Sequence, residues 1–96
     1  MKRYDWSEEK NRQLHKERNI TFEDVLFQIE SGSLIGIIPH PNQEDYPHQQ
    51  VYIVNIDDYI YLVPFVEDDE KVFMKTIIPS RKATKKYLME RGSKWS

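Results

Sequence analysis

The sequence predicts a single α+β domain with two N-terminal helices, an antiparallel sheet of about four strands and a C-terminal helix. Three observations predict this fold class. Two helix-capping patterns come early in the chain, apolar strand-like runs follow them, and the last of these runs stops at a proline just before a cationic segment. Ninety-six residues suffice for one hydrophobic core, so we expect residues 1–96 to form one domain.

The first elements are predicted to be a short strand over residues 3–6 and two helices. Ser7 is suited to cap a polar helix that runs to about residue 18, and Asn19 is suited to a left-handed helix end. Thr21 begins the second helix, with Asp24 in the reciprocal capping position, and residues 31–32 end it. Apolar residues at i, i+3, i+4 and i+7 predict a core-facing stripe, which consists of Phe22, Val25, Leu26 and Ile29.

Four strands are predicted over residues 34–38, 51–56, 59–66 and 72–78. A polar loop over residues 40–48 joins the first two, and tight turns at 57–58 and 67–71 join the others, which favours antiparallel neighbours. Pro64 cannot donate a backbone hydrogen bond and is therefore expected at an edge or a bulge. Ser80 is expected to cap a last helix that ends near Gly92.

Charge is divided unevenly along the chain. Residues 81–96 contain six cations and one acid, a balance of +5, whereas residues 1–80 contain eight cations and fifteen acids, a balance of −7. The total of −2 conceals this division. A basic segment on an otherwise acidic protein indicates a surface that meets a polyanion or an acidic protein partner.

Composition excludes several classes of site. The chain has no cysteine, so disulfides and thiolate metal sites are excluded, which is compatible with a cytoplasmic protein. We expect no signal peptide and no membrane association, because no stretch approaches the ~20 apolar residues of a membrane span. The histidines His15, His40 and His48 have no metal-binding spacing, and a chain without a second lobe cannot enclose a large cofactor, so no metal or cofactor is expected.

Two blocks of the sequence resemble the BrnT-type toxins, a branch of the RelE/ParE superfamily of small bacterial toxins. The first block begins Trp6-Ser7-Glu8-Glu9-Lys10 and continues through Ile20-Thr21-Phe22-Glu23-Asp24-Val25; the second is Ile77-Ile78-Pro79-Ser80-Arg81-Lys82-Ala83. The chain departs from the family pattern at the position after the tryptophan, at the His-Gly turn, at a helix asparagine and at the strand arginine. At these positions, in the same order, the chain has Ser7, Arg18-Asn19, Leu14 and Thr76, and Lys75 directly precedes Thr76.

The resemblance implies the toxin of a type II toxin–antitoxin system. Such a toxin is a metal-independent endoribonuclease of the cytoplasm that acts on mRNA, free or on the ribosome, and is neutralised by a small, DNA-binding antitoxin. The RNA's own 2′-hydroxyl attacks the adjacent phosphorus, which requires cations for the developing charge and groups that move protons.

Candidate catalytic residues are cations at family positions and histidines that titrate near neutrality, namely Arg81, Lys10, His48 and His40. Candidate RNA-binding residues are cations and aromatic rings near the chain's end and in the strands, namely Lys75, Lys82, Lys85, Lys86, Tyr61 and Tyr87. Each has a plain structural interpretation: solvated helix cations, surface loop histidines and tyrosines that pack a sheet.

Two alternatives to an active ribonuclease follow from the same residues. The chain has no strong nucleophile, no paired-carboxylate spacing and no glycine-rich phosphate loop, which favours a module that binds without catalysis. Poisons of DNA gyrase within the superfamily act in this way. The second alternative is a structural or regulatory protein whose basic segment docks on an acidic partner.

Overall fold

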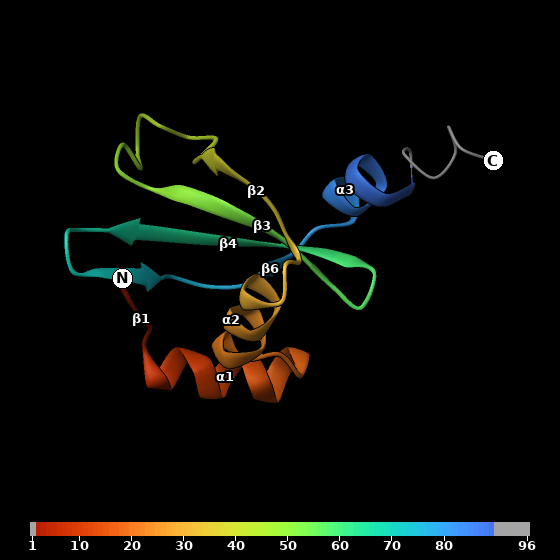
Figure 1. Ribbon diagram of the computed structural model, residues 1–96, viewed down its shortest axis with the longest axis horizontal. Coiled ribbons are helices and arrows are strands. Elements are labelled where there is room, and N and C mark those ends of the chain that lie inside the picture. The colour runs from red at the N-terminus through yellow and green to blue at the C-terminus, as the bar shows by residue number, and fades with distance from the viewer. Residues whose placement is uncertain (1, 90–96) are drawn as a thin grey trace.

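The computed structural model describes residues 2–89 and has an α+β fold in which helices lie on both faces of a central sheet (Figure 1). The chain begins with β1 (Arg3–Asp5), α1 (Glu8–Arg18) and α2 (Phe22–Glu30). Four further strands follow, β2 (Leu34–Pro39), β3 (Gln50–Ile56), β4 (Tyr59–Glu67) and β5 (Lys71–Met74). The short strand β6 (Ile78–Pro79), helix α3 (Arg81–Thr84) and one π-helical turn, η1 (Lys85–Met89), complete the described part.

The sheet is mixed rather than wholly antiparallel, and it has six strands rather than about four. Its order is β1-β5-β4-β3-β2, and β6 pairs with β4 beyond the end of β5. The strands β2 to β6 pair antiparallel, as predicted, but β1 pairs parallel with β5. The parallel pair joins residues 3–5 to residues 71–73, and no local sequence pattern encodes a contact of that kind.

The predicted strand over residues 72–78 is two strands with a break between them. Backbone pairing stops after Met74 and resumes at Ile78. Pro64 of β4 lies opposite this break, and its carbonyl accepts a hydrogen bond from the Lys75 N–H at 2.8 Å. In an antiparallel strand the N–H and C=O of one residue point to the same neighbouring strand. The Pro64 nitrogen, which carries no hydrogen, therefore faces the interruption. The expectation of an edge or a bulge was therefore wrong: Pro64 lies in an inner strand, beside a broken neighbour.

The helix boundaries follow the predicted caps. The Ser7 hydroxyl accepts from the Lys10 N–H, and Asn19 ends α1 in the left-handed region at φ 54°. Thr21 and Asp24 form a complete capping box at the start of α2. The Ser80 hydroxyl accepts from the Ala83 N–H at the start of α3. The predicted end of the last helix near Gly92 lies outside the described residues.

One buried polar residue fixes the angle between α1 and α2. Asn11 is 7% exposed; its side-chain oxygen accepts from the Phe22 N–H at 2.8 Å and its amide donates to Glu23 at 2.7 Å. The Phe22 N–H belongs to the first turn of α2, where no intrahelical acceptor exists. Asn11 therefore satisfies this donor while holding the two helices together.

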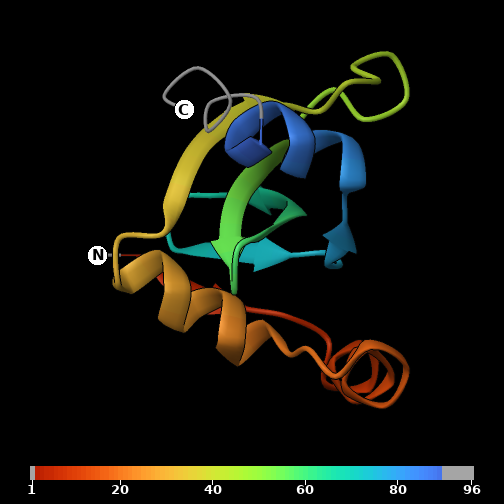
Figure 2. The same ribbon diagram turned by 90° about the vertical axis from the view of Figure 1, so that its right-hand side faces the viewer.

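The hydrophobic core fills the space between the α1–α2 layer and one face of the sheet, which we call the core face. Figure 2 shows α1 and α2 below the sheet and α3 above it. Phe22 and Val25 of the predicted stripe are fully buried, and Ile29 packs against the core at partial burial. The core face is formed by alternate residues of the inner strands, among them Tyr52, Val54, Val63, Phe65, Val72 and Met74.

Candidate nucleic-acid interface

The opposite face of the sheet contains a groove beside α3. Two adjoining hollows of about 330 and 230 Å³ form it, and they have Ile38, Pro41 and Leu62 in common. We call them together the α3 groove. Its floor is apolar and comes from β2, β3, β4 and β6, with Ile38, Val51, Ile53, Leu62, Pro64 and Ile78. Its walls carry the polar groups, with Ser80, Lys82 and Lys86 on one side and His40 on the other.

Helix α3 is anchored to the sheet through a buried threonine. Thr84 is 6% exposed; its hydroxyl accepts from the Ile60 N–H of β4 at 2.8 Å and donates to the Ser80 carbonyl at 2.7 Å. The Ser80 N–H in turn donates to the Ile60 carbonyl at 3.0 Å. These bonds fix the rotation of α3 on the sheet and therefore decide which of its cations face the groove.

Two of the four cations between residues 81 and 89 line the groove. Lys82 and Lys86 are four residues apart and so share one side of the helical segment. The Lys86 ammonium lies 5.3 Å from the centre of the Tyr87 ring, which also lines the groove. Arg81 and Lys85 are exposed, share another side, and are not among the lining residues.

His40 lines the groove from the opposite wall, at the end of β2. Its Nδ1 accepts a hydrogen bond from the Asn42 N–H at 3.0 Å, and its ring centre lies 4.4 Å from that of Tyr46. His40 was expected from the sequence as a catalytic residue, whereas its contact with Asn42 was not expected. Pro41 and Asn42 indicate a turn at this point, but no sequence pattern predicts the bond from the Asn42 N–H to the His40 ring.

The other candidate site residues lie outside the groove. Lys10 is in the first turn of α1, and Tyr61 packs against the core from the core face, so both belong to the side of the sheet that α1 and α2 cover. His48 is exposed in the β2–β3 loop. Lys75 is exposed with its ammonium 5.5 Å from the Phe73 ring centre, beyond the groove's lining. The structure therefore places His40, Lys82, Lys86 and Tyr87 along the groove and leaves the other candidates outside its lining, namely Arg81, Lys10, His48, Lys75, Lys85 and Tyr61.

Acidic groups are kept away from the groove. None of the residues in the described part of the chain that line the two hollows is acidic. A larger hollow of about 480 Å³ lies beside α1 and α2, and its lining includes Asp24 and Asp57. An anion is therefore repelled at that hollow and attracted at the α3 groove.

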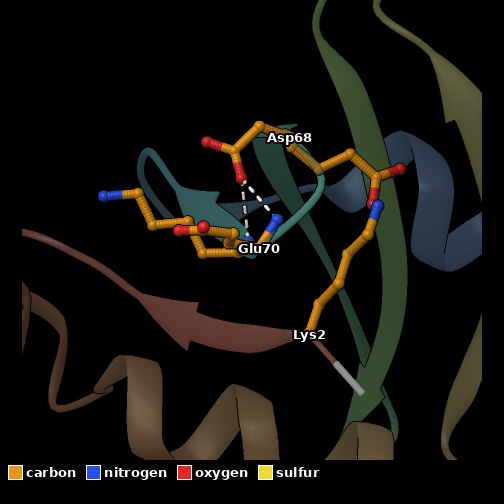
Figure 3. Close-up of polar contacts among 5 residues, drawn as sticks. Lys2, Asp68 and Glu70 are labelled. Atoms are coloured by element: carbon orange, nitrogen blue, oxygen red, sulfur yellow. Dashed lines mark hydrogen bonds and ion pairs between the residues drawn. The ribbon is translucent and has the colours of Figure 1, made fainter.

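The acidic turn between β4 and β5 is satisfied internally (Figure 3). Lys2 forms an ion pair with Glu67 at 2.8 Å, and this hydrogen bond raises the pKa of the Lys2 ammonium. The Asp68 carboxylate accepts from the backbone N–H groups of Glu70 and Lys71, and these two bonds lower the pKa of Asp68. The Asp68 carboxylate thus helps to shape the backbone of the turn.

Within residues 2–89 no group of three or more histidine, aspartate or glutamate side chains is placed to hold a metal ion. No helix of that part of the chain is long and apolar enough to cross a membrane.

Comparisons with known proteins return no match: neither a family model, nor a curated protein sequence, nor a solved structure is similar to this chain.

Proposed function

We propose that this chain binds single-stranded RNA in the α3 groove and cleaves it as the toxin of a type II toxin–antitoxin pair of the BrnT type. The observation that carries the proposal is the charge pattern of the groove. Lys82 and Lys86 line an apolar hollow to which no acidic side chain of residues 2–89 contributes, although the chain as a whole is acidic. Phosphates meet the two ammonium groups, and unstacked bases meet the apolar floor and Tyr87.

Cleavage of this kind needs no metal. The RNA's 2′-oxygen loses its proton to solvent water and forms a bond to the adjacent phosphorus, the bond from phosphorus to the 5′-oxygen breaks, and that oxygen takes up a proton from water, leaving a cyclic phosphate. Lys82 and Lys86 would stabilise the charge that develops on the phosphate oxygens. Arg81 begins α3 beside them and is free of ion pairs within the described residues, so a rotation of its long side chain could bring it to the same phosphate.

The test uses purified full-length protein, labelled mRNA and a chelator. Wild type is expected to cleave mRNA in the chelator, and the double variant Lys82→Gln/Lys86→Gln is expected to lose cleavage. Lys16→Gln, which removes an exposed cation from α1 on the other side of the sheet, is the matched control and should retain cleavage. A folded protein that leaves RNA intact, with or without ribosomes, and does not slow bacterial growth on induction would contradict the proposal.

A second candidate function is binding without cleavage, and one observation favours it. Lys10 and His48, two of the residues expected to act in catalysis, are not brought to the groove. The groove would then hold RNA, or an acidic surface such as that of a gyrase or another protein partner, without moving protons. Intact RNA recovered from a tight complex, or inhibition of DNA supercoiling without ribonuclease activity, would support this function against the first.

The toxin hypothesis also requires a cognate antitoxin. A protein that neutralises the groove must present an acidic or amphipathic segment to Lys82 and Lys86, and a small DNA-binding protein encoded beside this chain is the expected source. Co-expression of that neighbour should abolish RNA cleavage and protect Lys82 and Lys86 from amine-reactive reagents. Protection that falls instead on Lys10 and Lys16 would place the partner on the other face.

A further inference from the structure

The loop between β2 and β3 holds the His40 ring and backbone in place. The His40 N–H donates to the Gln49 carbonyl at 3.0 Å, and the His40 carbonyl accepts from the Gln43 side-chain amide at 2.7 Å. The Asn42 N–H donates to Nδ1 of the ring at 3.0 Å. The Tyr46 ring lies against the imidazole at 4.4 Å between centres, tilted by 35°.

The rest of the loop fixes the groups that contact His40. The Asn42 side chain donates to the Asp45 carboxylate at 2.8 Å and accepts from the Asp45 N–H at 3.2 Å. The Tyr46 N–H donates to the Asn42 carbonyl at 3.0 Å, and the Gln49 N–H donates to the Tyr46 carbonyl at 3.2 Å. A segment without helix or strand is thus held by its own polar groups in a shape that presents one imidazole to the groove.

The bond from Asn42 decides which ring nitrogen of His40 carries the proton. A backbone N–H can only donate, so Nδ1 must be unprotonated, and the proton of the neutral imidazole lies on Nε2. This Nε2–H has no hydrogen-bond partner among residues 2–89, and His40 lines the α3 groove. A neutral imidazole in this state offers the groove a donor and no acceptor, so it cannot take a proton from the 2′-hydroxyl of RNA.

We propose that His40 is a binding residue and not a proton shuttle: its Nε2–H donates a hydrogen bond to an acceptor oxygen of RNA at the β2 end of the α3 groove. Tyr46 is a positioning residue, which acts by holding the imidazole plane. The choice of RNA as the ligand rests on the proposed function, whereas the position of the proton rests only on the loop.

The first experiment measures the proton position without RNA. Two-dimensional NMR of the ¹⁵N-labelled full chain distinguishes a protonated from an unprotonated ring nitrogen. The spectra are recorded at a pH high enough for imidazole rings to be neutral. A His40→Gln sample identifies the His40 signals among the three histidines. We expect the Nε2–H form in wild type and in Tyr46→Phe, and a mixture of both forms in Tyr46→Ala. A wild-type His40 protonated on Nδ1 would overturn the proposal.

The second experiment measures binding and cleavage of a short oligouridylate. Removing one hydrogen bond should weaken binding by His40→Ala about threefold to tenfold, whereas His40→Gln, which keeps a donor at the place of Nε2, should bind within about twofold of wild type. His15→Gln changes an exposed histidine of α1, outside the groove, and serves as the matched control. His40→Gln should also retain cleavage. A proton shuttle likewise predicts intact binding by His40→Gln but abolished cleavage, and that loss of cleavage would overturn the proposal.

An oligomer of the same length without bases identifies the acceptor. If His40→Ala weakens the abasic oligomer as much as the oligouridylate, the acceptor is a phosphate or ribose oxygen; if only the oligouridylate is weakened, it is a base oxygen. Equal binding of both oligomers by His40→Ala and wild type would overturn the RNA contact. Absence of RNA binding by wild type would overturn the proposed function and this contact together, while the NMR measurement would still decide the proton position.

Discussion

The two faces of the central sheet are formed by alternate residues of the same strands, yet they differ in how completely helices cover them. On the core face Val63 is fully buried and Phe65 is 2% exposed beneath α1 and α2. On the other face Ile60 is fully buried near α3, while Leu62 is partly exposed and Ile78 is 42% exposed where the groove opens. Two helices of eleven and nine residues close one face, and the short helical segment over residues 81–89 leaves part of the other open.

This difference leaves the domain with an open apolar face although it has no enclosed cleft. The long helices supply the stability by burying one face, so the other can retain exposed apolar side chains beside cations. A contiguous apolar surface that is rimmed by polar groups is a common feature of interaction sites. Substitutions on the two faces should therefore have separable effects, on stability for one and on binding for the other.

The largest expected effect comes from the core face. Phe22→Ala removes a fully buried ring that stacks on Trp6 at 5.6 Å, and it should lower the free energy of unfolding by about 3–5 kcal/mol. Ile78→Ala in the groove floor removes a side chain that is already 42% exposed and should cost about 1 kcal/mol or less. Urea unfolding followed by circular dichroism measures both. Similar losses from the two variants would mean that the faces are not distinct.

The next largest effect is expected at Thr84, which anchors α3 to the sheet. Thr84→Val keeps the shape of the side chain but leaves the buried Ile60 N–H without its acceptor, which should cost about 1–3 kcal/mol. The same variant should weaken RNA binding, because α3 carries the groove's cations. Thr84→Ser retains the hydroxyl and is the control for both measurements. If RNA affinity is unchanged in a folded Thr84→Val variant, the placement of α3 does not determine how strongly the groove binds RNA.

A smaller effect is expected at the break between β5 and β6. Arg18 of α1 donates to the Ile77 carbonyl at 2.8 Å, in the stretch between the paired residues of β5 and β6. Because Arg18 is exposed, Arg18→Gln should cost only about 1 kcal/mol. Arg12→Gln, an exposed cation of the same helix, should fall within about 0.5 kcal/mol of wild type in the same unfolding measurement.

The smallest effect concerns the acidic turn and its dependence on pH. The pKa of Asp68 is lowered from 3.8 by hydrogen bonds that favour the charged form, so the folded state binds this proton less tightly than the unfolded state does. Its stabilisation is therefore present above about pH 4 and is lost as pH falls through the lowered pKa. Asp68→Ala should unfold slightly more easily than wild type at pH 7, and the difference should vanish in acid. A difference that persists in acid would assign the effect to backbone shape alone.

Elements bounded by a local chemical signal were predicted well from the sequence. Ser7, Thr21 and Ser80 cap the helices as expected, and the turn at Asp57-Asp58 adopts positive φ angles of 53° and 63°. The parallel pairing of β1 was missed because it depends on a contact between residues about seventy apart. The break after Met74 was missed because residues 72–78 form a β-prone run in which only Lys75 and Thr76 are polar. Val72, Met74 and Ile77 are all buried, and the spacing of three between the last two does not fit a period of two.

The candidate site was predicted in part. The sequence located the cationic segment but not the cations that face the groove. Their choice depends on the rotation of α3, which the Thr84 hydroxyl sets through hydrogen bonds to β4 and Ser80. Lys10 was proposed from resemblance alone, and the sheet separates it from the groove. The contact between Tyr46 and His40 arises only in the folded loop.

The most direct test of the central claim is the salt dependence of RNA binding to the α3 groove. The affinity of wild type for a single-stranded oligouridylate should fall as salt rises, and Lys82→Gln/Lys86→Gln should reduce the slope of log K against log salt by about 1.4, or about 0.7 for each lost phosphate contact. Lys16→Gln should leave the slope unchanged. If the double variant binds with the wild-type slope, or if Lys16→Gln reduces it equally, the RNA does not lie in this groove and the account is wrong.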